Sequence, residues 1–459
     1  MHLIIRNFLP LLFLVLFFAG SAAASDPPRY LAFQIFTGAW DSNEKRLSRP
    51  PPSTNLRNAI VDLRQRIGAA QTANRHIGFV FGPIAFDNTD EQVRELIESG
   101  FNIALETGVA FGLHIDDLMF WGRLKELDTP ANIEWLDWKG TPNTGRLLDW
   151  SPAIKAMPQL CINSKGVQSA VSMRAALIGR EVAKGVKKLS MAGKDDLFLG
   201  VIAGWETEIG KDFDTRQRLR YCALTNAGYS ERNKPGDIDS ALSKIIREFI
   251  GLWASSLNNA GVPPGKVYSH IALMSDKSPP SAFCDLCIPG LSTYPFPGVL
   301  AAWQKELANH GNPPWASGEG TAIDPREAGR GGHGTDMEGY LGNLLNHGAV
   351  LVTVFGWGMG DANNPFRKIA ESGEAVAAYR KFLRGEKLSE APIPDAFAMF
   401  PANLQEKIQK VQTALPRWLK EHGPAQIQDD VEKLKQSVEE QRFDDAAAMA
   451  DAILKILVK

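Results

Sequence analysis

The stretch Leu197-Phe-Leu-Gly-Val-Ile-Ala-Gly-Trp-Glu-Thr-Glu208 joins a short apolar run to two carboxylates. Its apolar part, residues 197–203, has the length and composition of a buried strand. A second junction of this kind is Pro314-Trp-Ala-Ser-Gly-Glu319, where a shorter apolar run ends near a glutamate. Carboxylates that follow two buried strands predict a pair of acids in one cleft, and glycoside hydrolysis uses such a pair.

Six further apolar runs of strand length lie at residues 30–36, 76–81, 109–115, 266–274, 286–292 and 349–355. Amphipathic helical patterns lie between runs, at residues 55–71, 90–107, 164–191, 236–260, 298–309 and 336–347. Eight strands that alternate with helices predict an α/β fold, a (β/α)8 TIM barrel over residues 28–385. An open doubly wound sheet is the alternative, which the absence of Gly-x-Gly-x-x-Gly at a strand-to-helix turn disfavours. The runs at 286–292 and 314–317 are the weakest strand predictions, because proline lies in or beside each.

The two ends of the chain differ from the predicted barrel. Residues 1–24 combine an apolar core with a final run of small residues, which predicts a signal peptide and an exported protein, periplasmic or secreted. The apolar core is too short to span a membrane. After a proline-marked linker, residues 386–402, we expect residues 403–459 to form a helical hairpin or small bundle, built from two amphipathic segments at 404–419 and 426–458. Pro416 should break or kink its first helix, and the unit either packs on the barrel or docks a protein partner.

The composition is that of an ordinary globular protein. Of 459 residues, 44% are apolar, and the formal net charge is −2, which gives no argument for nucleic acid as a partner. No cofactor motif is evident. Four cysteines permit disulfides in an exported protein without revealing their pairing. The pair Cys284 and Cys287 lacks the second pair or the spaced histidines of a zinc site, so a structural disulfide or buried thiols are expected.

Catalytic groups of barrel enzymes lie at the carboxyl ends of the strands. At these predicted ends stand acids, aromatic residues and a histidine: His114, Asp116, Trp205, Glu206, Glu208, Tyr294, Glu319 and Trp357. The long segment 118–163, between the third and fourth runs, is rich in tryptophan. Its aromatic side chains either stack on sugars or form a local core.

The pattern resembles the clan A superfamily of retaining glycoside hydrolases, which includes β-galactosidases, endo-galactanases and cellulases. The resemblance implies that Glu206, after strand four, is the acid/base and that Glu319, after strand seven, is the nucleophile. It also implies that Tyr294 contacts the nucleophile and that Trp357 forms the floor of a sugar subsite. This sequence has Trp205 where the superfamily usually has an asparagine that binds a sugar hydroxyl.

The acids can be assigned on physical grounds as well. A neighbouring tryptophan and a second carboxylate both favour the neutral form of Glu206, as a general acid requires. Glu208 is the alternative acid/base, because alternate residues of a strand face the same way. If Glu208 does not serve this role, we expect it to form a salt bridge in the loop. His114 and Asp116 share one face and either orient a sugar hydroxyl, serve structurally or bind a metal.

Three functions follow from these residues. The first is an exported glycoside hydrolase that acts with retention on a β-linked polysaccharide or oligosaccharide and needs neither cofactor nor metal. The second is a metal-dependent barrel hydrolase, such as a polysaccharide deacetylase, with His114, Asp116 and His270 as ligands. The third is a barrel that binds carbohydrate without cleaving it.

Overall fold

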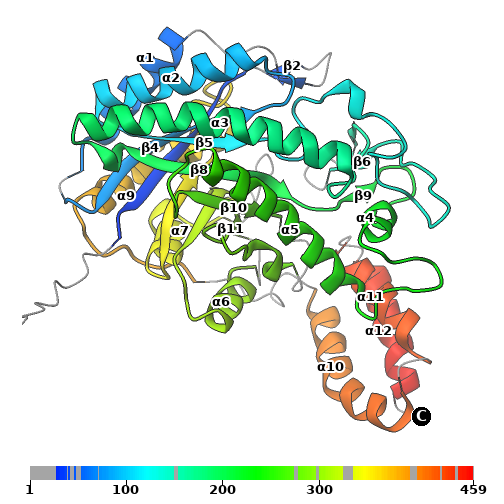
Figure 1. Ribbon diagram of the computed structural model, residues 1–459. Coiled ribbons are helices and arrows are strands. Elements are labelled where there is room, and N and C mark those ends of the chain that lie inside the picture. Colours follow the sequence, from blue (N-terminus) through cyan, green and yellow to red (C-terminus); the bar gives the residue numbers. More distant parts are fainter. Residues whose placement is uncertain are drawn as a thin grey trace, which may run out of the picture.

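The computed structural model shows a closed barrel of parallel strands in the order of the chain (Figure 1). It describes residues 27–38, 40–41, 46–47, 53–70, 72–148, 153–272, 278–295, 299–323, 334–392, 401–423, 426–439 and 443–457. The barrel strands are β1 (Arg29–Phe36), β4 (Arg75–Ile84), β5 (Ala110–Ile115), β8 (Phe198–Thr207), β10 (Val267–Ile271), β11 (Gly290–Thr293), β12 (Trp315–Gly320) and β13 (Ala349–Val354). Each overlaps one predicted run, so the predicted TIM barrel is confirmed and the open sheet is excluded.

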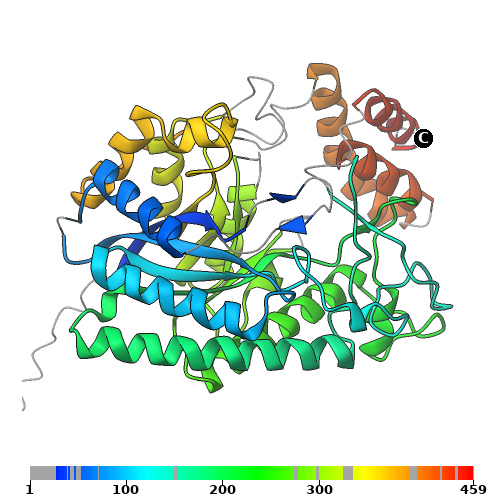
Figure 2. The same cartoon turned by 90° about the horizontal axis from the view of Figure 1, so that it is seen from above.

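Helices cover the outside of the barrel (Figure 2). They are α1 (Ser53–Ile67), α2 (Asp90–Thr107), α3 (Lys165–Met191), α4 (Tyr221–Asn226), α5 (Ile238–Asn259), α6 (Val299–Asn309), α7 (Met337–Leu345), α8 (Pro365–Ala370) and α9 (Gly373–Leu383). Helix α2 has the predicted bounds because local signals set both ends. Thr89 forms a capping box with Gln92, and Gly108 ends the helix in the left-handed conformation, with φ of 68°.

The barrel has two core layers, because successive side chains of a strand point inward and outward. Outward side chains such as Phe79 and Phe111 pack with helix residues such as Trp253 of α5. A smaller inner cluster fills the barrel with Tyr30, Ala32, Val80, Ala110, Leu199, Ile202, Tyr268, Ala316, Val350 and Leu351. The same alternation continues to Gln34, His114 and His270 near the carboxyl ends of their strands, where the buried interior becomes polar.

The segment between β5 and α3 forms a small structure of its own. It contains the short helix η1 (Lys125–Leu127) and the strands β6 (Arg146–Leu147) and β7 (Lys155–Ala156). Strands β6 and β7 form a three-stranded sheet with β9 (Lys211–Asp212), which follows β8. The ring of Trp138 meets that of Tyr221 edge to face, with centroids 5.1 Å apart. Trp135 and Trp138 of this segment also pack against the large core around the barrel, so these side chains serve packing without forming a separate core. A hairpin of β2 (Trp40–Asp41) and β3 (Arg46–Leu47) follows β1.

The C-terminal residues form α10 (Ala402–His422), α11 (Gln428–Glu439) and α12 (Phe443–Leu457), beside the barrel in both views (Figures 1 and 2). Helix α10 continues through Pro416, so of the two expected effects, a break or a kink, the break does not occur. The amphipathic pattern at 426–458 forms two helices instead of one. The three helices share an apolar core that includes Leu404, Trp418 and Ile453. This packing offsets the roughly 3 kcal/mol that proline costs inside a helix.

Cys284 and Cys287 form a disulfide, while Cys161 and Cys222 are buried thiols. Within the described ranges, no helix is both long and apolar enough to cross a membrane. The predicted signal peptide and residues 393–400 of the predicted linker lie outside the described residues.

Candidate active site

Two hydroxyl groups of one short segment, residues 292–294, donate hydrogen bonds to the two predicted catalytic glutamates. The Ser292 hydroxyl donates to Glu206 Oε1 at 2.6 Å, and the Tyr294 hydroxyl donates to Glu319 Oε1. Since Ser292 and Tyr294 are two residues apart at the end of β11, the carboxyl groups that they hold lie in one site. The pKa of Tyr294 is raised well above its usual value, first by burial and then by the charges of Glu319 and Glu206. The structure therefore brings together Glu206, Glu319 and Tyr294, as predicted.

Glu206 stands on an unusual backbone. Its φ is 56°, in the left-handed region that side chains other than glycine seldom adopt. Asp117 holds both neighbours: it accepts from the Trp205 N–H at 2.8 Å and from the Thr207 hydroxyl at 2.6 Å. Such a conformation persists only where the surroundings hold it in place. The sequence places Asp117 at the end of the third run, beside Asp116, but its pattern assigned no role to this residue.

Glu319 is a buried carboxyl on the neighbouring strand, with only 5% of its surface exposed. Burial raises its pKa to about 7, although the bond from Tyr294 acts in the opposite direction. Its Oε2 atom is buried and has no hydrogen-bond partner among the described residues. The carboxyl group is thus oriented through one oxygen, which leaves the other available for chemistry.

Glu208 has a different environment from Glu206. It forms a buried ion pair with Arg146 of β6. The structure therefore supports the salt-bridge expectation for Glu208. Because the backbone at Glu206 departs from regular strand geometry, the argument that both side chains face the same way does not apply here.

Asp116 is fully buried and binds the backbone of the loop that follows β5. Its two carboxyl oxygens accept from the N–H groups of Phe120, Trp121 and Gly122, at 2.8, 2.7 and 3.2 Å. These contacts support the structural alternative for Asp116. They also hold the loop that places the Trp121 ring edge to face with that of Trp205, at 5.7 Å between centroids.

The two predicted tryptophans lie in different places. Trp205 is 9% exposed and stacks on the His114 ring, with centroids 3.9 Å apart. Trp357 is not brought to the glutamates. Its ring is buried against Phe33 at 5.0 Å, and the Arg66 guanidinium lies over it at 4.5 Å. Phe33 also packs on Tyr379 of α9, so Trp357 belongs to the core between barrel and helices.

Two half-buried aromatic residues at strand exits were missed by the sequence analysis. Phe36, at the end of β1, lies 5.8 Å from the Phe355 ring and 6.1 Å from that of Trp205. Phe355 follows β13 directly, two residues before Trp357. Apolar residues at a strand exit are a weak signal in the sequence, because most belong to the core.

His114 and His270 form a polar layer beneath the site. His114 Nδ1 lies 2.9 Å from Gln34 Oε1, and its Nε2 lies 2.9 Å from His270 Nδ1. His270 Nε2 lies 2.7 Å from Ser292 Oγ. Burial lowers the pKa of both imidazoles, that of His270 to about 3, so both rings are neutral. All four ring nitrogens are thus engaged, and the described residues contain no cluster of three metal-ligating side chains.

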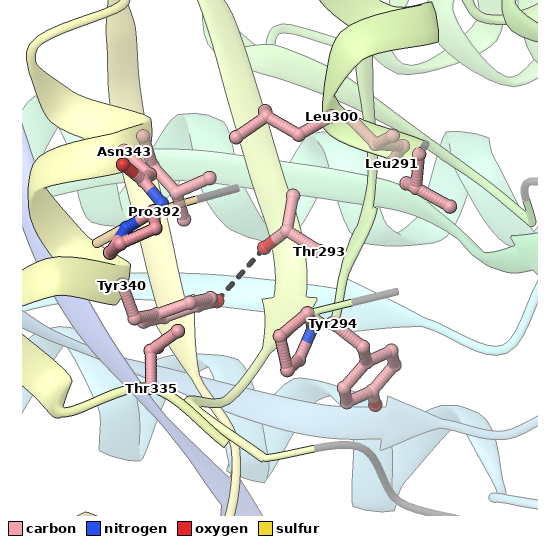
Figure 3. A pocket seen from close by; sticks show the side chains of 11 residues that line it. Leu291, Thr293, Tyr294, Leu300, Thr335, Tyr340, Asn343 and Pro392 are labelled. Atoms are coloured by element: carbon pink, nitrogen blue, oxygen red, sulfur yellow. Dashed lines mark hydrogen bonds between the residues drawn. The ribbon is translucent and has the colours of Figure 1, made fainter. Parts of the chain in front are cut away.

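A small hollow lies beside the site (Figure 3). Its lining comes from β11, α6, α7 and their flanks, and it includes Tyr294 but neither catalytic candidate. Thr293 and Tyr340 are bonded across it at 2.8 Å. The hollow is therefore a neighbour of the glutamate pair and does not contain it.

No model of a known protein family and no curated protein match this chain. Solved structures that it is similar to include a Bacteroides ovatus xyloglucanase of glycoside hydrolase family 5 bound to a heptasaccharide, at 11% identity and a TM-score of 0.40 over 77% of this chain and 74% of that one. The structure of fungal β-1,4-galactanases is similar at 12% identity and a TM-score of 0.35, over 70% of this chain and 97% of that one. A β-mannanase from the blue mussel Mytilus edulis is similar at 8% identity and a TM-score of 0.37, over 80% of this chain and 95% of that one. At such low values the likeness carries no argument about substrate, and the barrel rests on the strand pairing of this chain.

Proposed function

We propose that the protein is a glycoside hydrolase that cleaves a β-linked polysaccharide or oligosaccharide with retention of configuration. Glu206 is the acid/base and Glu319 the nucleophile. The observation that carries the proposal is the pair of carboxyl groups, each held by one hydroxyl of the Ser292–Tyr294 segment. Retaining glycosidases need two carboxyl groups close together on opposite sides of the bond to be broken.

The reaction takes two steps. Glu206 donates its proton to the glycosidic oxygen while Glu319 attacks the anomeric carbon, so the old C–O bond breaks as an ester to Glu319 forms. Glu206, now ionised, then takes a proton from water, and that water displaces Glu319 from the sugar. The bond from Tyr294 to Oε1 orients Glu319, and Oε2 is the oxygen that attacks.

Other residues near the carboxyl ends of the strands have supporting parts in this proposal. The rings of Trp205, Trp121, Phe36 and Phe355 form one aromatic group that includes the chain neighbour of Glu206, and a sugar ring can stack on it. Asp116 holds the backbone of the loop that carries Trp121, and His114 acts through its contacts with Trp205 and His270. Export through residues 1–24 is also a proposal, and sequencing of the mature N-terminus would test it. Partner binding by the C-terminal helices is another, which co-purification would test.

The test is a screen of the purified protein on β-linked glucans, galactans, mannans and xylans, with the anomer of the first product read by NMR. We expect cleavage of one class with release of the β-anomer. An α-anomer as the first product would exclude retention. Loss of activity with a strong chelator would favour the metal-dependent alternative, and binding without cleavage would favour the non-catalytic one.

The pH dependence of kcat/KM offers an independent measurement. Because burial raises the pKa of Glu319 to about 7, this group takes up a proton as the pH falls through neutrality and can no longer attack. We therefore expect an acid limb centred near pH 7, with kcat/KM falling about tenfold per pH unit below it. Circular dichroism at each pH would show that the protein stays folded. An activity that is flat from pH 5 to pH 8 would contradict this assignment.

A further inference from the structure

We propose that Gln34, His114, His270 and Ser292 form a reversible hydrogen-bond chain whose direction follows the protonation state of Glu206. The inference rests on the proposed acid/base role of Glu206, which must be protonated in one step and ionised in the next. The links of the chain measure 2.9, 2.9, 2.7 and 2.6 Å from Gln34 to Glu206. Four strands contribute to it before it reaches Glu206 on β8: β1, β5, β10 and β11.

The ionised state of Glu206 sets one direction. Ser292 has a single proton, which it donates to the carboxylate, so its oxygen must accept from His270 Nε2–H. His270 Nδ1 then carries no proton and accepts from His114 Nε2–H. His114 Nδ1 accepts in turn, so Gln34 must present its amide N–H. Both imidazoles are neutral and carry their proton on Nε2.

The protonated state reverses every bond. Glu206 donates to Ser292, and Ser292 donates to His270 Nε2. His270 Nδ1–H donates to His114 Nε2, and His114 Nδ1–H donates to Gln34 Oε1. Both rings are again neutral but carry their proton on Nδ1. Glu206 takes its proton from solvent, and each ring keeps the same number of protons, so the two states differ in tautomer and not in imidazole charge.

Gln34 can form the buried end of this hydrogen-bond chain in either direction. Its amide offers a donor on one side and an acceptor on the other, and a half-turn of the amide exchanges them. Gln34 Nε2 is buried without a hydrogen-bond partner in the described part of the chain, while Oε1 faces His114. An exchange therefore breaks no other bond of Nε2 among the described residues.

A glycine packs closely against each of the two histidines. A Cβ atom on Gly82 would lie 2.7 Å from His114 Cβ, and one on Gly318 would lie 2.6 Å from His270 Cγ. Distances under about 3 Å are not tolerated between such atoms. Both rings are fully buried, so water does not compete for their nitrogens.

Neutral rings are required in both states. Burial lowers the pKa of His114 and His270, and it outweighs the opposing effect of the Gly204 carbonyl on both. Other ionisable groups also surround the chain and Glu206. They are Asp116 and Asp117 after β5, Glu208 with Arg146, Tyr294 after β11 and Glu319 on β12.

The experiment uses the full-length protein with ¹⁵N-labelled histidine, and no substrate. We expect the nitrogen shifts of His114 and His270 to change from the Nε2–H to the Nδ1–H pattern as the pH falls, at one shared midpoint and without either ring becoming charged. Ser292→Ala should abolish this change, because it disconnects the rings from Glu206. Glu206→Ala should abolish it as well.

Two further variants serve as controls. Thr353→Val removes a buried hydroxyl outside the chain that has no partner among the described residues, and it should leave the change intact. Glu319→Gln should keep the change while moving its midpoint. Tautomers that do not vary with pH in the parent protein, or that still vary in Ser292→Ala, would overturn the proposal. A protein that cleaves no glycan but shows the change would refute the function alone.

Discussion

Glu206→Gln and Glu319→Gln should each lower the rate of glycan cleavage by roughly a hundredfold or more. Each carboxyl group acts in the bond-breaking step, and the amide can neither donate the acid proton nor attack the anomeric carbon. The measurement is kcat/KM on the glycan that the parent protein cleaves best. Glu208→Gln should have a smaller effect, since its carboxylate is engaged by Arg146. Glu98→Gln, on the exposed face of α2, is the matched control and should leave the rate unchanged.

Azide separates the two roles. In Glu319→Ala, azide can attack the anomeric carbon directly while Glu206 still donates its proton, so an activated aryl β-glycoside should give an α-glycosyl azide. In Glu206→Ala, Glu319 still forms the covalent intermediate, and azide then displaces it to give the β-glycosyl azide. Exchanged products would reverse the assignments. The proposed function fails if both single Gln variants hydrolyse glycans as fast as the parent.

Glu319→Gln should also make the protein more stable at pH 8. Burial raises the pKa of Glu319 from 4.5 to about 7, so the folded state binds this proton more tightly than the unfolded state does. The stability that comes from this tighter binding is present below about pH 4.5 and is lost as the pH rises through about 7. Glutamine stays neutral throughout, so the variant avoids a penalty on the order of 3 kcal/mol at pH 8.

Urea unfolding followed by tryptophan fluorescence checks this prediction at pH 8 and at pH 5. The gain in stability should be large at the higher pH and small at the lower one. An equal difference at both values would contradict the burial argument. A variant that is more stable but inactive would show that Glu319 serves function at the expense of the fold.

Local patterns predicted most of the fold. Eight apolar runs marked the barrel strands, and the cap signals at Thr89 and Gly108 set the limits of α2. These features depend on neighbours within a few residues of one another, which the sequence displays directly. At Pro416 such rules left a break or a kink open, and the break does not occur. Its helix continues because packing within the C-terminal core outweighs a local penalty.

The direction of the side chains at a strand exit was harder to predict. Trp357 follows β13, as the resemblance required, yet it turns into the outer core. Gly356 has a φ of 106°, and a Cβ atom there would lie 2.7 Å from the Phe366 carbonyl oxygen. This turn directs the chain away from regular strand geometry. Phe355, just before it, instead contacts the ring of Phe36, which in turn lies 6.1 Å from that of Trp205.

By itself, the sequence determined where the strands end and therefore which two glutamates share the carboxyl end of the barrel. The tertiary structure decided what holds them. Ser292 and Glu206 are 86 residues apart, His114 and His270 are 156 apart, and Gln34 and His114 are 80 apart. Hydrogen bonds between residues so distant exist only once the barrel closes and brings its strands side by side. The acids were therefore readable from local pattern, while their partners depended on the closed fold.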